Sequence, residues 1–165
     1  MGMGHGCGLQ MFFSTVEASI DARGRVLVPS SFRTALEGAS KFYLFPSIDR
    51  GGYLEGGGQP LMDEYLAILK NMSPHDRDRR AFITSIFSKG AEVSMDQAGR
   101  ANLPANLLSV AGIEKELVFV GAMDRFQIWN PDRFAAYENE MSEHAAANQD
   151  ALAQPFQQFR TGGQS

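Results

Sequence analysis

The stretch DARGR at residues 21–25 returns as DQAGR at residues 96–100, an offset of 75 residues. Read outward at that fixed offset without gaps, the two copies share further identities: Glu17 with Glu92, Ser19 with Ser94, Pro29 with Pro104, Asp49 with Asp124, and Arg50 with Arg125. The sequence therefore predicts that one structural unit, containing the pattern D-x-x-G-R, occurs twice in the chain.

Each copy of the motif is expected to join two strands. Residues 16–20 and 91–95 alternate apolar and polar side chains, which is typical of a half-buried strand. The alternation resumes after each motif, and Pro29 or Pro104 then opens a short amphipathic helix. Each copy ends in a predicted apolar hairpin, over residues 42–45 with 53–54 and over residues 117–120 with 126–129. The predicted fold class is α+β.

The size and charge of the chain limit the possible architectures and partners. The chain has 165 residues, and repeats of about 45 residues are too small to bury a sizeable core alone. We therefore expect the two copies to share one core and the chain to self-associate. The net charge of −4 argues against a generally basic nucleic-acid binder. It allows a DNA-binding protein whose cations gather on one face.

The organisation along the chain follows from composition and periodicity. The predicted segments are a disordered leader over residues 1–10, a first repeat over 11–58, a helical connection over 59–87, a second repeat over 88–130, a C-terminal helix over 131–145 and a flexible tail over 146–165. Either Met1 or Met11 could be the natural start. The glycines at 56–58 lack the lysine of a phosphate-binding loop and are interpreted as a flexible loop.

No group of residues predicts catalysis or a bound cofactor. The histidines are His5, His75 and His144, and none lies in a repeat. Asp21 and Asp96 could form an acid pair if the two turns met, but nothing places a base beside a nucleophile. His5 and Cys7 are too few ligands for a metal site. We expect no enzymatic activity, cofactor, metal or small-molecule ligand.

A single cysteine and the lack of long apolar segments indicate where the protein resides. Cys7 cannot form an intramolecular disulfide, which fits a reducing compartment. No run approaches the roughly 18 apolar residues of a membrane span, and the N-terminus lacks a secretory signal pattern. We expect a cytoplasmic protein that does not enter a membrane.

Turn geometry accounts for only part of the repeated motif. An Asp that accepts backbone N–H groups and a Gly with positive φ form the turn, and these residues are Asp21, Gly24, Asp96 and Gly99. The turn does not require Arg25 or Arg100, so we interpret them as ligands for an anion or a guanine edge. Arg23 adds a further cation to the first copy, which we expect to make the stronger contact.

The two turns, the stretch DARGRVLVPSSFR, the segment SPHDRDRR and the stretch ELVFVGAMDRFQIWN resemble the MraZ family of bacterial transcription regulators over residues 11–140. The resemblance implies two tandem swapped-hairpin β-barrel repeats of the AbrB type, with connecting and flanking helices and a pseudo-two-fold axis within the chain. It assigns the DNA contacts to Asp21, Arg25, Asp96 and Arg100, and we add Arg23 from its charge and proximity.

The resemblance also implies a function. A ring-shaped homo-oligomer would bind short direct repeats of double-stranded DNA in its own promoter, ahead of the division and cell-wall gene cluster. Such a regulator would be cytoplasmic and associated with the nucleoid. The alternative is a ring-forming structural or interaction protein whose basic turns bind an acidic protein partner, which the interleaved acidic and basic residues of the helical region 60–87 favour.

Overall fold

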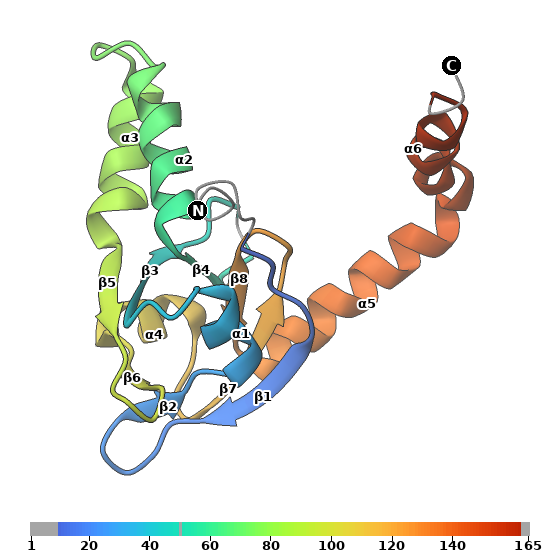
Figure 1. Ribbon diagram of the computed structural model, residues 1–165. Helices are drawn as coiled ribbons and strands as arrows, with labels where there is room; N and C mark the ends of the chain where they lie inside the picture. Colours follow the sequence, from blue (N-terminus) through green and yellow to red (C-terminus); the bar gives the residue numbers. More distant parts are fainter. Residues whose placement is uncertain (1–9, 50, 163–165) are drawn as a thin grey trace, which may run out of the picture. The chain divides into compact units, whose positions relative to one another are not determined.

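The computed structural model describes residues 10–49 and 51–162, and it divides into two compact units after Pro131. The first unit contains all of the described strands (Figure 1). Two helices make up the described part of the second unit. The expectations for the leader, His5, Cys7 and Arg50 lie outside the described residues.

The elements of the first unit follow the predicted order. The first repeat contains β1 (Thr15–Ser19), β2 (Arg25–Leu27), α1 (Ser30–Ala35), β3 (Lys41–Pro46) and β4 (Leu54–Gly57). The second repeat contains β5 (Ala91–Ser94), β6 (Arg100–Asn102), α4 (Ala105–Ala111), β7 (Glu116–Gly121) and β8 (Phe126–Trp129). Between them lie α2 (Gln59–Lys70), α3 (Arg77–Ser85) and a short 3-10 helix (Phe87–Lys89). The predicted mixture of helices and antiparallel strands is confirmed.

The strands of the two repeats are paired with each other. The larger sheet has six strands in the order β1-β7-β8-β4-β3-β5, and β2 pairs with β6 in a separate two-stranded sheet. Within this sheet the counterparts in the two repeats are β1 and β5, β3 and β7, and β4 and β8. Replacing every strand by its counterpart gives the same strand order read backwards. All of these pairings are antiparallel. The described strands thus form two open sheets, whereas the resemblance implied closed barrels.

One hydrophobic core joins the two repeats. Phe32 on α1 and Leu107 on α4 occupy equivalent positions, and both are fully buried in the same cluster. The Phe32 ring lies 5.9 Å from the ring of Phe119 and 5.4 Å from that of Phe126, both in the second repeat. Because α1 of one repeat packs against aromatic residues of the other, neither repeat has a complete core by itself.

The glycines at 56–58 are not the flexible loop that the sequence predicts. Gly56 and Gly57 end strand β4, Gly58 caps α2, and all three are buried. A Cβ on Gly56 would lie 2.5 Å from the Phe126 ring, and a Cβ on Gly58 would lie 2.4 Å from the Gln10 side chain. The absence of a Cβ at Gly56 and Gly58 therefore allows the Phe126 and Gln10 side chains to pack directly against the backbone. Composition alone does not reveal this packing.

The second unit corrects the prediction of a flexible tail. Helix α5 spans Pro131–Ala147. Helix α6 spans Gln149–Gly162, within the segment for which a flexible tail was expected. The spacing of Leu152, Phe156 and Phe159 places these side chains on one face of α6, which is the periodicity of an amphipathic helix. All three are exposed, and Phe159 retains 84% of its accessible surface. Within the described ranges, no helix has both the length and the apolar character needed to cross a membrane.

Candidate nucleic-acid interface

The first D-x-x-G-R motif forms a tight turn between β1 and β2. One carboxylate oxygen of Asp21 accepts hydrogen bonds from the backbone N–H groups of Arg23, at 2.9 Å, and Arg25, at 2.8 Å. Gly24 has a φ of 79°, a conformation that glycine adopts without steric cost. The N–H groups of Arg25 and Arg23 and the Arg25 side chain hold the pKa of the Asp21 carboxyl below its ordinary value, despite some desolvation.

The second motif repeats this backbone geometry between β5 and β6. One carboxylate oxygen of Asp96 accepts from the N–H groups of Ala98 and Arg100, both at 2.9 Å. Gly99 has a φ of 88°. The N–H groups of Arg100 and Ala98 likewise hold the pKa of Asp96 below its ordinary value, and the Arg25 charge adds to this. Both turns therefore have the chemistry that the sequence predicts.

The two turns meet at Arg25. Its Nε atom lies 3.3 Å from Oδ2 of Asp21, and its Nη1 atom lies 3.6 Å from Oδ2 of Asp96. The guanidinium thus lies within ion-pair distance of both motif carboxylates and favours their ionised forms. A catalytic acid pair needs one carboxyl group with a raised pKa, so this arrangement does not resemble such a pair.

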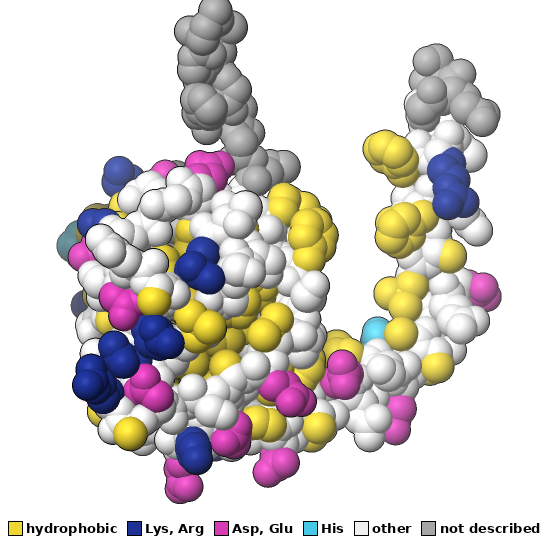
Figure 2. Space-filling view, turned by 60° about the horizontal axis from the view of Figure 1, so that its bottom comes forward, with side chains coloured by type: hydrophobic (Ala, Val, Ile, Leu, Met, Phe, Trp, Pro, Cys, Tyr) yellow, Lys and Arg dark blue, Asp and Glu magenta, His cyan; other side chains and the backbone are white. Residues whose placement is uncertain are grey.

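Arg23 and Arg100 are differently placed from Arg25. Both are exposed, and within the described part of the chain neither forms an ion pair with a carboxylate. Figure 2 brings this end of the molecule forward and shows Lys and Arg side chains close to Asp and Glu side chains on one face. The turns therefore present two unpaired guanidinium groups beside one that is held by carboxylates.

Sequence reasoning missed the contribution of Arg33, which lies on α1. Its Nε atom donates a hydrogen bond to the backbone carbonyl of Val28 at 3.2 Å. Its side chain also covers the second turn, because a Cβ on Gly99 would lie 2.6 Å from Arg33 Cδ. No motif singles out this arginine, since the contact depends on how α1 of one repeat packs against the turn of the other.

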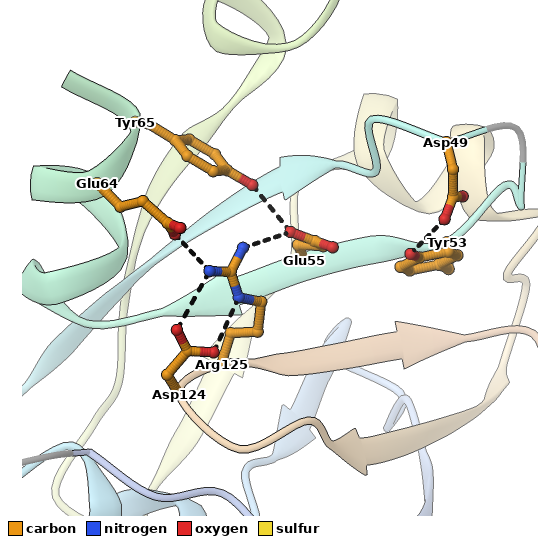
Figure 3. Close-up of polar contacts among 7 residues, drawn as sticks. All are labelled: Asp49, Tyr53, Glu55, Glu64, Tyr65, Asp124 and Arg125. Carbon is orange, nitrogen blue, oxygen red and sulfur yellow. Dashed lines mark hydrogen bonds and ion pairs between the residues drawn. The ribbon is translucent and has the colours of Figure 1, made fainter. Parts of the chain in front are cut away.

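A second group that the sequence did not reveal surrounds Arg125 (Figure 3). Arg125 forms ion pairs with Glu55 on β4, at 3.2 Å, with Glu64 on α2 and with Asp124. Tyr65 donates its hydroxyl to Glu55 at 2.9 Å. Burial and the Glu55 carboxylate raise the pKa of the Tyr65 hydroxyl, which keeps it protonated as a donor. Arg125 therefore connects α2 to the sheet and is not part of the exposed basic surface.

The described residues contain no group of three or more His, Cys, Asp or Glu side chains placed to hold a metal ion. The two turns and the Arg125 network are the groups of charged side chains described above. Of these, only the turns combine exposure with unpaired cations, and they are the candidate interface.

Comparison with known proteins agrees with the resemblance found in the sequence. A family model described as "MraZ protein, putative antitoxin-like" matches residues 86–156. The protein named Transcriptional regulator MraZ from Hyphomonas neptunium is 38% identical over 152 residues, which cover 91% of this chain and 92% of that protein. Its namesake from Caulobacter vibrioides is 37% identical over 143 residues, covering 86% and 91%.

A third protein of the same name, from Parvibaculum lavamentivorans, is 34% identical over 146 residues, covering 87% of this chain and 91% of that protein. These alignments extend over both repeats and nearly the full length of each relative. The chain therefore belongs to the MraZ family of transcriptional regulators.

Proposed function

We propose that this protein is a sequence-specific DNA-binding transcriptional regulator that contacts double-stranded DNA through its two D-x-x-G-R turns. The observation that carries the proposal is the pairing of β2 with β6, which brings both turns to one end of the first unit. Three arginines and two aspartates then lie on one small surface, in a chain whose net charge is −4. DNA affinity follows the local field at the contacts, so this surface can bind phosphate although the whole chain is acidic.

Each motif residue has a separate role in this proposal. Asp21 and Asp96 hold the turns and position the Arg25 guanidinium, while Arg25 and Arg100 contact guanine edges. Arg23 contacts phosphate. Because Arg25 is already held by two carboxylates, Arg100 carries at least as much of the base contact, and the first turn contributes chiefly through Arg23.

The strand exchange supports a more specific fold proposal. The first strand of each repeat pairs with the third strand of the other, β1 with β7 and β5 with β3. We interpret this exchange as two tandem swapped-hairpin repeats of the AbrB type, related by a pseudo-two-fold axis. The repeats span residues 11–58 and 88–130, with helical segments over 59–87 and 131–162.

The proposed active form is a ring-shaped homo-oligomer at direct repeats in its own promoter, upstream of the division and cell-wall gene cluster, in the cytoplasm and on the nucleoid. The exposed apolar face of α6, formed by Leu152, Phe156 and Phe159, favours self-association, because such a face is costly to leave in water. Tethered protomers would raise the apparent affinity for an array of repeats without any new contact.

The interface is tested by fluorescence anisotropy with the duplex upstream of the protein's own gene and an unrelated duplex, at two salt concentrations. We expect the change Arg100→Ala to cost roughly 1–3 kcal/mol on the promoter duplex and to remove the preference for it. Arg80→Ala is the matched control, because Arg80 is an exposed arginine on α3, at the opposite end of the unit from the turns (Figure 1). Equal losses for the two variants would contradict the assignment.

The alternative function is distinguished by the same measurement. An interaction protein whose turns bind an acidic protein partner would bind neither duplex selectively, even at low salt.

The ring is tested by the double change Phe156→Ser and Phe159→Ser. Light scattering should then show a smaller particle, and affinity for several repeats should fall while affinity for a single repeat is kept. A smaller particle with undiminished affinity for the array would contradict the role of tethering.

A further inference from the structure

The ribbon formed by β2 and β6 presents a face that the D-x-x-G-R motif does not describe. Its register pairs Arg25 with Asn102, Val26 with Ala101, and Leu27 with Arg100. Val26 and Ala101 point into the core, and each retains only 1% of its accessible surface. Since side chains alternate along a strand, the other four residues share the opposite, outward face.

This outward face has the composition of a base-reading surface. Leu27 is 49% exposed, and Arg100 and Asn102 are also exposed. A two-stranded antiparallel ribbon fits the major groove, where arginine pairs with guanine, asparagine with adenine, and an apolar side chain with the thymine methyl group. A leucine half exposed on a short ribbon adds little to the core, so folding alone does not account for its position.

A shallow hollow lies beside this face. It encloses about 550 Å³, and its lining includes Arg25, Arg100 and Asn102. The Asn102 carboxamide extends to the first turn, since its oxygen would lie 3.8 Å from a Cβ placed on Gly24. Asn102, a residue of the second repeat, thus borders both the hollow and the turn of the first repeat.

In residue type, the outward face departs from two-fold symmetry at one pair of positions. In the repeat, Arg25 corresponds to Arg100 and Val26 to Ala101, whereas Leu27 corresponds to Asn102. The two halves of the face therefore have the same residue type at the arginine positions, although Arg25 lies between two carboxylates and Arg100 is exposed. They differ in residue type where one half carries a carboxamide and the other an apolar group. A symmetric face favours a palindromic site, because the symmetry of a binding site mirrors that of the protein.

We propose that Leu27 and Asn102 are specificity-determining residues that give each protomer one orientation on DNA. Asn102 reads an adenine in one half of the site, and Leu27 contacts a thymine methyl group in the other. The inference rests on the proposed DNA-binding function and extends it, because unequal halves fix the direction of each protomer. Protomers that all point the same way around a ring match direct repeats rather than inverted ones.

The test is a selection of binding sites from a randomised duplex pool with the full-length protein and the variants Leu27→Asn and Asn102→Leu. Two symmetrised duplexes are then made, each an inverted duplication of one half of the wild-type site. We expect the wild type to select an asymmetric site and to bind both symmetrised duplexes about tenfold more weakly. Leu27→Asn should regain affinity for one of these duplexes, and Asn102→Leu for the other.

The control is Ile48→Asn, which makes the same kind of change at a residue that is 60% exposed in the β3–β4 turn. It should select the wild-type site. Circular dichroism verifies that every variant is folded. Folded variants that select the unchanged asymmetric site, or that lose binding to all duplexes equally, would overturn the inference. A wild-type protein that selects no site would instead overturn the proposed function itself.

Discussion

The two D-x-x-G-R turns have nearly the same backbone and different surroundings. In both, the Asp accepts two backbone N–H groups and the Gly has a φ close to 80–90°. The first turn leaves room for a Cβ at Gly24, which would lie 3.8 Å from the Asn102 side-chain oxygen, and its final arginine, Arg25, is held by carboxylates from both turns. The second turn is covered at Gly99 by Arg33, and its final arginine, Arg100, is exposed.

The repeated motif thus sets the backbone conformation of the turn, but it does not decide whether the final arginine is free to contact a ligand. Each turn is contacted by residues of the other repeat, Asp96 at the first and Arg33 at the second. Arg33 has Leu108 as its counterpart, and Asp21, the counterpart of Asp96, forms no ion pair with Arg100 among the described residues. Identical motif residues therefore acquire different partners. The expectation that the first copy dominates rested on counting charges within each motif alone.

The largest expected effect tests whether the two repeats form one folding unit. Phe32→Ala should lower the free energy of unfolding by about 3–5 kcal/mol, and Leu107→Ala by about 2–5 kcal/mol, since both side chains are fully buried. Urea unfolding is followed by the fluorescence of Trp129, which lies in the second repeat. If the repeats share one core, Phe32→Ala must shift the Trp129 transition although Phe32 lies in the first repeat.

The next comparison concerns the two turn glycines. Gly24→Ala should cost about 1–2 kcal/mol of stability, because an L side chain is strained at this positive φ. Gly99→Ala has the same strain and also displaces Arg33, which loses the hydrogen bond to Val28, for about 0.5–1.5 kcal/mol more. Chemical denaturation measures both. Equal costs would show that Arg33 does not stabilise the second turn.

A smaller effect concerns Arg23, which has Ala98 as its counterpart. Arg23→Ala should weaken binding to all duplexes about equally and reduce the slope of log affinity against log salt by about 0.9, as expected for one lost phosphate contact. Ala98→Arg should increase that slope by a similar amount. If Ala98→Arg has no effect, the second turn does not approach the phosphate backbone as the first does.

The smallest effect is on pH dependence. The pKa values of Asp21 and Asp96 are lowered in the folded protein, mainly by hydrogen bonds from the backbone N–H groups of Arg25 and Arg100. Their contribution to stability is therefore complete above the ordinary pKa of 3.8 and is lost as the pH falls through the lowered values. Titration of the carboxyl carbons by NMR should give two values below 3.8. In the Arg25→Ala variant both should rise, and unchanged values would contradict the shared ion pairs.

Much of the organisation follows from the sequence alone. The 75-residue repeat, the strand alternation, the turn chemistry of Asp and Gly, and the α+β class are set by side-chain periodicity and local backbone preference, and each can be found by counting along the chain. The alternation of side chains along each strand also indicates that Leu27 and Asn102 face outward, since each of them follows a buried residue.

The tertiary structure alone decided which residues meet. Exchange of strands between the repeats places Arg25 between Asp21 and Asp96, Arg33 over Gly99, and Arg125 among Glu55 and Glu64. These contacts join residues up to 71 positions apart in the sequence, as for Arg25 and Asp96, and no local pattern encodes such distances. Composition also failed at Gly56, where close packing outweighs the preference of glycine for flexible segments. It failed along α6 as well, where alanine and glutamine are good helix formers and the apolar residues have helical spacing.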